Sequence, residues 1–381
     1  MINKAGKNSV FQPLVIKDIR IELPIIQGGM GVGVSLYPLA SAVAAEGGAG
    51  IISSAALDRL LSKRYNKRFN TYDATYAEIS LAKSKGGVAG INIMVALARD
   101  YKDSVRGAVD AGADMIISGA GLPLSLPSIA RSKHTALIPI VSSARALNII
   151  CKKWQRQGYL PDAAVLEGPL AGGHLGFHMD QINLEENRLE NLLPPVKDMA
   201  KKFGDFPIIV AGGIYTNADI KRFLDLGADG VQMGTRFLAT VESSATPEYK
   251  DAVISADQED IIVTGKPGSP CGLPFRVIKH SPMYQESLNG GRPPKCNKGF
   301  VLLKDEEGKY TRCPAKEDYK SYFCICNGLL SSAGYNPDKE KPLYTVGTNA
   351  YLVNRIVPVK DLMDDLKGIP TPAASGSTDP R

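Results

Sequence analysis

The chain has 381 residues, of which 44% are apolar and 22% charged, and its formal net charge is +6. This small charge gives no case for nucleic-acid binding, and no apolar run reaches the roughly 20 residues that a membrane-spanning helix needs. Residues 1–12 lack the apolar segment of a secretory signal, so we expect a cytoplasmic location.

Residues 24–257 alternate between short apolar runs and longer runs with helical spacing. The apolar runs predict strands over 24–30, 49–55, 88–94, 113–120, 136–143, 163–168, 206–213 and 230–239. The intervening runs predict helices over 38–47, 75–86, 99–112, 123–132, 144–157, 189–204, 217–227 and 247–257. The strands are apolar throughout, which is typical of parallel strands buried on both faces. Eight such units predict an α/β protein, a (β/α)8 TIM barrel over residues 1–263, with a doubly wound open sheet as the alternative.

The periodic pattern ends after residue 257. Residues 264–345 are rich in Gly, Pro, Lys and Cys, and their low apolar content predicts a lid or excursion over the barrel. Residues 346–357 predict a strand and residues 359–366 a helix, and together 346–366 would pack on the barrel. Residues 367–381 have the composition of a disordered tail.

Five of the six cysteines lie in the last third of the chain, and they allow two interpretations. They are Cys271, Cys296, Cys313, Cys324 and Cys326. Zinc or an iron–sulfur cluster is one interpretation, although Cys-x-x-Cys pairs are typical of such sites and this chain has only a Cys-x-Cys pair. We favour buried thiols, with no metal site. Cys271 would lie where it can line a substrate pocket.

Glycines gather where the predicted strands end, which is the face on which barrel enzymes hold their ligands. Gly28 and Gly29 follow the first strand, Gly172 and Gly173 the sixth, and Gly212 and Gly213 the seventh. Barrels often bind a phosphate on backbone amides after strands seven and eight. We therefore expect the amides of Gly213, Gly234 and Thr235, with the Thr235 hydroxyl, to bind a phosphate beside the turn at Gly212.

Several motifs together resemble the nitronate monooxygenase family, once called 2-nitropropane dioxygenases, and the related enoyl-acyl-carrier-protein reductase II enzymes. They are PIIQGGM, GINIM, EGPLAGGHLG, VAGGI and VQMGTRFLATVESSATPEYK, and the resemblance covers residues 15–280 and, faintly, 346–366. It implies a TIM barrel that binds FMN non-covalently, with the phosphate on the amides named above. It also implies contacts to the flavin ring from Gly28, Gly29, Met30, Asn92 and Gly173.

The resemblance also implies that His174, in the AGGHLG loop, faces the flavin and the substrate. Because an imidazole ordinarily titrates near neutral pH, His174 would take a proton from a nitroalkane, hydrogen-bond a nitronate, or protonate an enoyl thioester. Gly172 would let this loop lie against the flavin edge. Ser118 is expected near the phosphate or the substrate, and Glu167 would orient the loop by accepting backbone hydrogen bonds.

Three functions remain open on the sequence alone. The first is FMN-dependent oxidation of nitronates by O₂ to carbonyl compounds and nitrite. The second is an NAD(P)H-dependent reductase of enoyl thioesters or quinones, since the two families share their flavin motifs. The third is a non-catalytic flavin- or metal-binding protein. The partners would be a small-molecule substrate, O₂ and, for the reductase, NAD(P)H; the sequence leaves a homodimer open.

Overall fold

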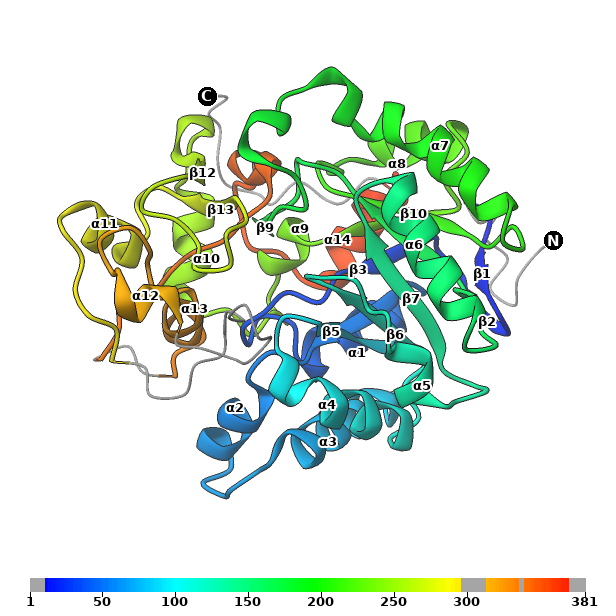
Figure 1. The fold of residues 1–381 in the computed structure, drawn as a ribbon, viewed down its shortest axis with the longest axis horizontal. Coiled ribbons are helices and arrows are strands. Elements are labelled where there is room, and N and C mark those ends of the chain that lie inside the picture. Colours follow the sequence, from blue (N-terminus) through cyan, green and yellow to red (C-terminus); the bar gives the residue numbers. More distant parts are fainter. Residues whose placement is uncertain (1–10, 296–312, 336–338, 370–381) are drawn as a thin grey trace.

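The computed structural model describes residues 11–295, 313–335 and 339–369. A closed barrel of eight parallel strands forms its centre (Figure 1). In chain order the strands are β3 (Ile25–Gln27), β4 (Ala49–Ser53), β5 (Val88–Met94), β6 (Met115–Gly119), β7 (Ala136–Val141), β8 (Ala164–Glu167), β10 (Ile208–Ala211) and β11 (Gly230–Met233). The last strand pairs with the first, with Met233 opposite Gln27, and this pairing closes the cylinder. The predicted TIM barrel is confirmed.

Helices surround the barrel and bury apolar side chains against the outer face of its strands. They are α1 (Tyr37–Ala45), α2 (Leu57–Arg64), α3 (Thr71–Lys83), α4 (Ala98–Asp110), α5 (Leu126–Ala130), α6 (Ala144–Gln155), α7 (Leu189–Lys201), α8 (Asn217–Asp225), α9 (Thr235–Leu238) and α10 (Pro247–Ile254). Side-chain caps fix several starts: Asn70, Ser143 and Thr216 each accept a hydrogen bond from an amide three residues on. No helix in the described ranges is long and apolar enough to cross a membrane.

The barrel interior is filled at the end opposite the strands' carboxyl ends. The N-terminal hairpin of β1 (Leu14–Ile16) and β2 (Ile19–Ile21) contributes Leu14 and Ile21 to the same apolar cluster as Ile26, Ile51 and Ile138. The hairpin therefore closes one end of the barrel, and the carboxyl ends of the strands remain available for ligands.

Two predicted strands are wrong in extent or type. The strand expected over 230–239 ends at Met233, because Gly234 caps α9 and the apolar Phe237 and Leu238 are buried by that helix. The strand expected over 346–357 is instead the 3₁₀ segment η4 (Thr348–Leu352), since its polar groups bond to barrel loops rather than to a strand. Short apolar runs do not separate these cases by periodicity. The helix expected over 359–366 is present as α14 (Val359–Leu366).

The described part of 264–345 contains regular structure that the sequence did not suggest. Strands β12 (Ile261–Thr264) and β13 (Phe275–Ile278) form an antiparallel sheet with β9 (Gly173–His174). Helices α11 (Pro282–Leu288), α12 (Pro314–Glu317) and α13 (Ile325–Ser332) lie beside this sheet, to one side of the barrel (Figure 1). A separate apolar cluster that includes Val277, Met283 and Phe323 binds them together. The expected lid and tail boundaries stay predictions, and residues 370–381 of the tail lie outside the described ranges.

Candidate active site

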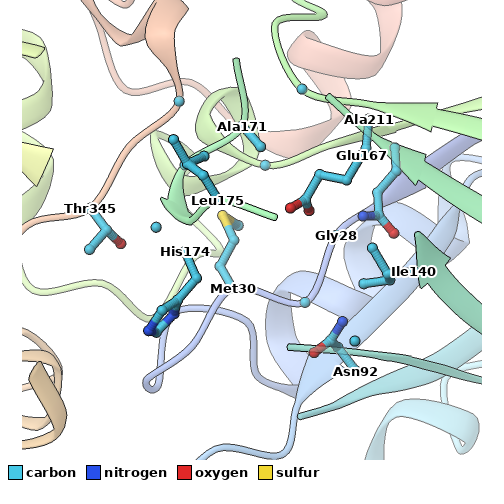
Figure 2. Close-up of a pocket in the computed structure, with 18 of the residues that line it drawn as sticks. Gly28, Met30, Asn92, Ile140, Glu167, Ala171, His174, Leu175, Ala211 and Thr345 are labelled. Atoms are coloured by element: carbon cyan, nitrogen blue, oxygen red, sulfur yellow. The ribbon is translucent and has the colours of Figure 1, made fainter. Parts of the chain in front are cut away.

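A cavity of about 430 Å³ opens at the carboxyl ends of the barrel strands. It brings together twelve of the thirteen residues predicted for the site, from loops far apart in the chain. They are Gly28, Gly29, Met30, Asn92, Glu167, Gly172, Gly173, His174, Gly212, Gly213, Gly234 and Thr235. Figure 2 shows Glu167 and Asn92 reaching the cavity from the barrel side and His174 from the opposite side.

Glycine is required at the rim because other residues would fill the space. A β-carbon at position 29 would lie 2.5 Å from the Asn92 β-carbon and 2.9 Å from the Ile52 carbonyl oxygen. Gly212 and Gly213 have φ values of +98° and +79°, in the region that side chains disfavour. The loops after the first and seventh barrel strands therefore present bare backbone to a bound molecule.

The two residues Gly213 and Thr235, which are predicted to bind a phosphate, are held by residues 347–349, which were expected to form a strand packed on the barrel. The Gly347 amide donates to the Thr235 Oγ1 at 2.9 Å, and Asn349 Nδ2 donates to the Gly213 carbonyl oxygen at 2.7 Å. These bonds hold Gly213 by its carbonyl oxygen and Thr235 by its hydroxyl, and neither bond uses the residue's own backbone amide. The Thr235 hydroxyl accepts in this bond, so its hydrogen remains available to an anion.

Two buried polar atoms without hydrogen-bond partners indicate whether a large polar ligand fits the cavity. Among the described residues, Gln232 Oε1 and Thr348 Oγ1 are buried with no hydrogen-bond partner, and both residues line the cavity. Buried polar atoms without partners are uncommon, and at the wall of a cavity such atoms can hydrogen-bond a ligand. A flavin mononucleotide carries ring donors and a phosphate, so the glycine-lined rim and these atoms fit it. Gly213, Gly234 and Thr235 would hold its phosphate.

His174 lies on a short strand whose pairing fixes its direction. β9 pairs with β13, with His174 opposite Phe275, and the two rings meet edge to face with centroids 4.6 Å apart. The His174 Nε2 lies 3.3 Å from the Cys271 Sγ, and the tautomer of the imidazole decides which atom donates. Desolvation in the cavity lowers the pKa of His174 to about 4. The imidazole is therefore neutral near pH 7 and able to accept a proton.

Glu167 is the second titratable group in the cavity. Desolvation raises the pKa of its carboxyl to about 7, whereas it lowers that of His174. Two groups whose environments move their pKa values in opposite directions are typical of sites that transfer protons. Within the part of the chain that the structure describes, no loop amide donates a hydrogen bond to the Glu167 carboxylate, and its orienting role stays a prediction.

Arg276 on β13 instead holds the loop that carries His174. Its buried guanidinium donates to the carbonyl oxygens of Pro169, at 2.8 Å, and Ala171. Desolvation lowers its pKa to about 10, and it remains charged. The sequence offered no signal for this residue, because it lies about a hundred positions from its partners.

Ser118 is the one predicted site residue that does not line the cavity. Its hydroxyl is fully buried, donates to the Ile93 carbonyl oxygen at 2.9 Å and lies 3.0 Å from the Tyr101 hydroxyl oxygen. The reason is the alternation of side chains along a strand: Ser118 points outward toward α4, away from the barrel axis.

The described residues offer no group of three potential metal ligands among His, Cys, Asp and Glu. Cys296, which belonged to the proposed metal set, lies outside the described ranges. The environment of Cys271 is largely apolar, and burial raises the pKa of its thiol.

A family model described as nitronate monooxygenase matches residues 12–368. An octahydro-indene-carboxyl-CoA dehydrogenase of Mycobacterium tuberculosis is 30% identical over 295 residues, covering 77% of this chain and 72% of the relative. A probable nitronate monooxygenase of Bacillus subtilis is 26% identical over 268 residues, covering 65% and 75%.

Solved structures share the architecture over nearly the whole chain. FabK from Thermotoga maritima aligns with a TM-score of 0.66 and 26% identity, covering 92% of this chain and 93% of that one. A nitroalkane oxidase from Streptomyces ansochromogenes aligns with a TM-score of 0.64 and 20% identity, covering 91% and 95%, which shows the fold alone.

Proposed function

Because this chain belongs to the nitronate monooxygenase family, a family of flavin-dependent oxidoreductases, we propose that it uses FMN and O₂ to oxidise nitronates to carbonyl compounds and nitrite. The observation that carries the proposal is the imidazole of His174, which lines a glycine-rich cavity of about 430 Å³ at the carboxyl ends of the barrel strands. Membership in an oxidoreductase family removes the reason for a non-catalytic interpretation.

FMN, when bound, supplies the electron-accepting group, and the protein supplies binding, orientation and proton transfer. Neutral His174 accepts the α-proton of a nitroalkane or donates a hydrogen bond to a nitronate oxygen, depending on its tautomer. Gly28, Gly29 and Asn92 would contact the flavin ring.

A second candidate is a nicotinamide-dependent flavin reductase or a dehydrogenase of acyl thioesters. The observation that favours it is the Mycobacterium tuberculosis relative, whose name specifies a carboxyl-CoA compound, at 30% identity. The flavin-binding loops are compatible with either activity, so the electron donor has to be identified by experiment.

The experiment mixes the purified flavin-loaded protein with each electron donor in the absence of O₂. Bleaching of the flavin absorbance by a nitronate, but not by NADH or NADPH, is the result expected for the first proposal. Rapid bleaching by NADH or NADPH would contradict the first proposal and support the flavin reductase. Nitrite release upon addition of O₂ provides the second readout, because only the oxidation of a nitronate forms it.

A further inference from the structure

A thiol and an imidazole lie within hydrogen-bonding distance of each other at the wall of the cavity. The Cys271 Sγ is 3.3 Å from the His174 Nε2. Both side chains also line a second cavity of about 50 Å³, and His174 lines the main cavity as well. A nucleophile beside a base that is itself held in position is the arrangement typical of nucleophilic catalysis. We name these two side chains the thiol–imidazole pair.

Backbone contacts hold both members of the pair in place. The Leu175 amide donates to the Pro274 carbonyl oxygen at 3.0 Å, next to the pairing of β9 with β13. The Cys271 amide donates to the Ser269 Oγ at 3.1 Å, which fixes the turn that carries the sulfur. Cys271 is partly exposed, and Leu273, two residues later, lines the main cavity. The sulfur therefore lies beside a route that is open to small molecules.

We propose that the thiol–imidazole pair adds to the β-carbon of small α,β-unsaturated carbonyl compounds, with Cys271 as the nucleophile and His174 as its base. The S–H bond and the carbon–carbon π bond break, and a C–S bond and a C–H bond at the α-carbon form. The proton passes from Sγ to Nε2 and then to the α-carbon. No group leaves and no external oxidant or reductant takes part, so the reaction is independent of the proposed nitronate oxidation.

The protonation states make the base necessary. Burial raises the pKa of the Cys271 thiol and lowers that of His174 to about 4, so both groups are neutral near pH 7. A neutral thiol is a weak nucleophile, because the thiolate is the form that attacks carbon. The Nε2 of a neutral imidazole is placed to take the thiol proton while the C–S bond forms.

The apolar surroundings favour addition over displacement. The other side chains that line the smaller cavity are aliphatic or contain sulfur, and they include Ile325, Leu329 and Leu330 of α13. A displacement would release an anion into these surroundings, and burying an unpaired charge costs much free energy. An addition leaves no ion behind, and the polarizable sulfur suits the equally polarizable β-carbon. The pair therefore selects electrophiles that have no leaving group.

Mass spectrometry of the flavin-loaded protein treated with methyl vinyl ketone tests this inference. We expect one molecule of the ketone on Cys271 before either the fully buried Cys151 or Cys326 of α13 reacts, and no such adduct in Cys271→Ser. Iodoacetamide, which reacts by displacement, is the matched reagent. Cys271 should favour methyl vinyl ketone over iodoacetamide more strongly than the free thiol glutathione does. Initial labelling at another cysteine, or the same preference as glutathione, would overturn the inference.

Two histidine variants test the base. His174→Gln keeps a polar side chain without a basic nitrogen, and it should slow adduct formation about 10²-fold, in the range that general-base catalysis contributes. His134→Gln replaces an exposed histidine that lines neither cavity, and it should leave the rate unchanged. An equal rate in His174→Gln and the parent would contradict the role of the imidazole. The comparison of the two reagents in the parent protein needs no variant, and it decides the preference for addition even if His174→Gln does not fold.

The outcome separates this inference from the proposed function, because labelling needs neither a nitronate nor O₂. If Cys271 forms the adduct and the protein oxidises no nitronate, the proposed function fails and the thiol–imidazole pair stands. If nitronates are oxidised and Cys271 does not react, the function stands and the inference fails.

Discussion

The imidazole of His174 is placed by three contacts that do not depend on a ligand. The strand pairing opposite Phe275, the edge-to-face ring contact and the Cys271 thiol together fix its position. A side chain held by its neighbours loses little freedom when the substrate binds, and such preorganisation is what proton transfer requires. The residue is therefore suited to act on the substrate.

Replacing His174 with alanine should separate proton transfer from flavin binding. We expect the His174→Ala variant to keep its flavin, because the predicted phosphate contacts lie elsewhere, and to lose about 10²–10³-fold in kcat/KM with a neutral nitroalkane. The loss should be smaller with the preformed nitronate, which needs no base. Oxygen consumption and the absorption spectrum measure the two properties. Equal activity of the variant and the parent with the neutral nitroalkane would remove the assigned role.

Glu167 should set the alkaline side of the pH profile. Its pKa of about 7 is raised, so the carboxyl is protonated and neutral below pH 7 and ionised above it. The ionised form places a negative charge in the cavity and opposes an anionic nitronate. We expect kcat/KM for nitronates to fall above about pH 7, and Glu167→Gln to remove that fall. The measurement is kcat/KM for a nitronate between pH 5 and 9. If kcat/KM of the Glu167→Gln variant still falls above pH 7, a group other than Glu167 causes the fall.

At the scale of elements, the three-stranded sheet of β9, β12 and β13 joins the barrel to the segment that follows it. β9 contributes two residues, Gly173 and His174, and the loop before it is held by Arg276 from β13. The loop that carries His174 is therefore part of a sheet whose other strands come from about one hundred residues later in the chain. Its position depends on that distant segment being folded.

Removing the charge of Arg276 should loosen this loop. Arg276→Met leaves the carbonyl oxygens of Pro169 and Ala171 without a donor, and charged hydrogen bonds of this kind contribute about 1.5–3 kcal/mol each. We expect a lower midpoint of urea unfolding, and a fall in kcat with KM little changed, because the loop is misplaced in the bound state. Arg276→Lys, which keeps the positive charge, should have a higher kcat than Arg276→Met. An unaltered kcat in Arg276→Met would mean that Arg276 contributes to stability alone.

The elements predicted from sequence alone were those whose pattern is local. The strand over 88–94 and the helix over 359–366 match the structure residue for residue, since periodicity and length identify them. The roles of Gly347 and Asn349 were not predictable, because they arise from contacts with the loops after β10 and β11. For Ser118 the predicted position at a strand end was correct, but its side chain lies on the outer face of the strand and not on the face toward the cavity.

At the scale of the whole molecule, a ligand that binds only the folded state stabilises it. FMN present at 100 times its Kd would add about 2.7 kcal/mol to the free energy of unfolding. With an unfolding entropy of about 2.1 cal/mol/K per residue, a chain of this length would gain about 3–4 °C in Tm. Riboflavin, which lacks the phosphate, should give a smaller gain at equal concentration, since the barrel rim then binds the ring alone.

The share of this stabilisation due to the phosphate should depend on Gly213. Gly213→Ala forces a side chain into a positive φ, and its β-carbon would lie 2.8 Å from Leu170, so the amide shifts away from the phosphate. Gly227→Ala imposes a similar φ, +97°, with nothing within 4 Å of the added carbon, and lies away from the cavity. Both variants should lower the Tm of the apoprotein, but only Gly213→Ala should reduce the difference between FMN and riboflavin in thermal unfolding. An equal difference in the two variants would mean that the phosphate binds elsewhere, because the backbone strain is common to both.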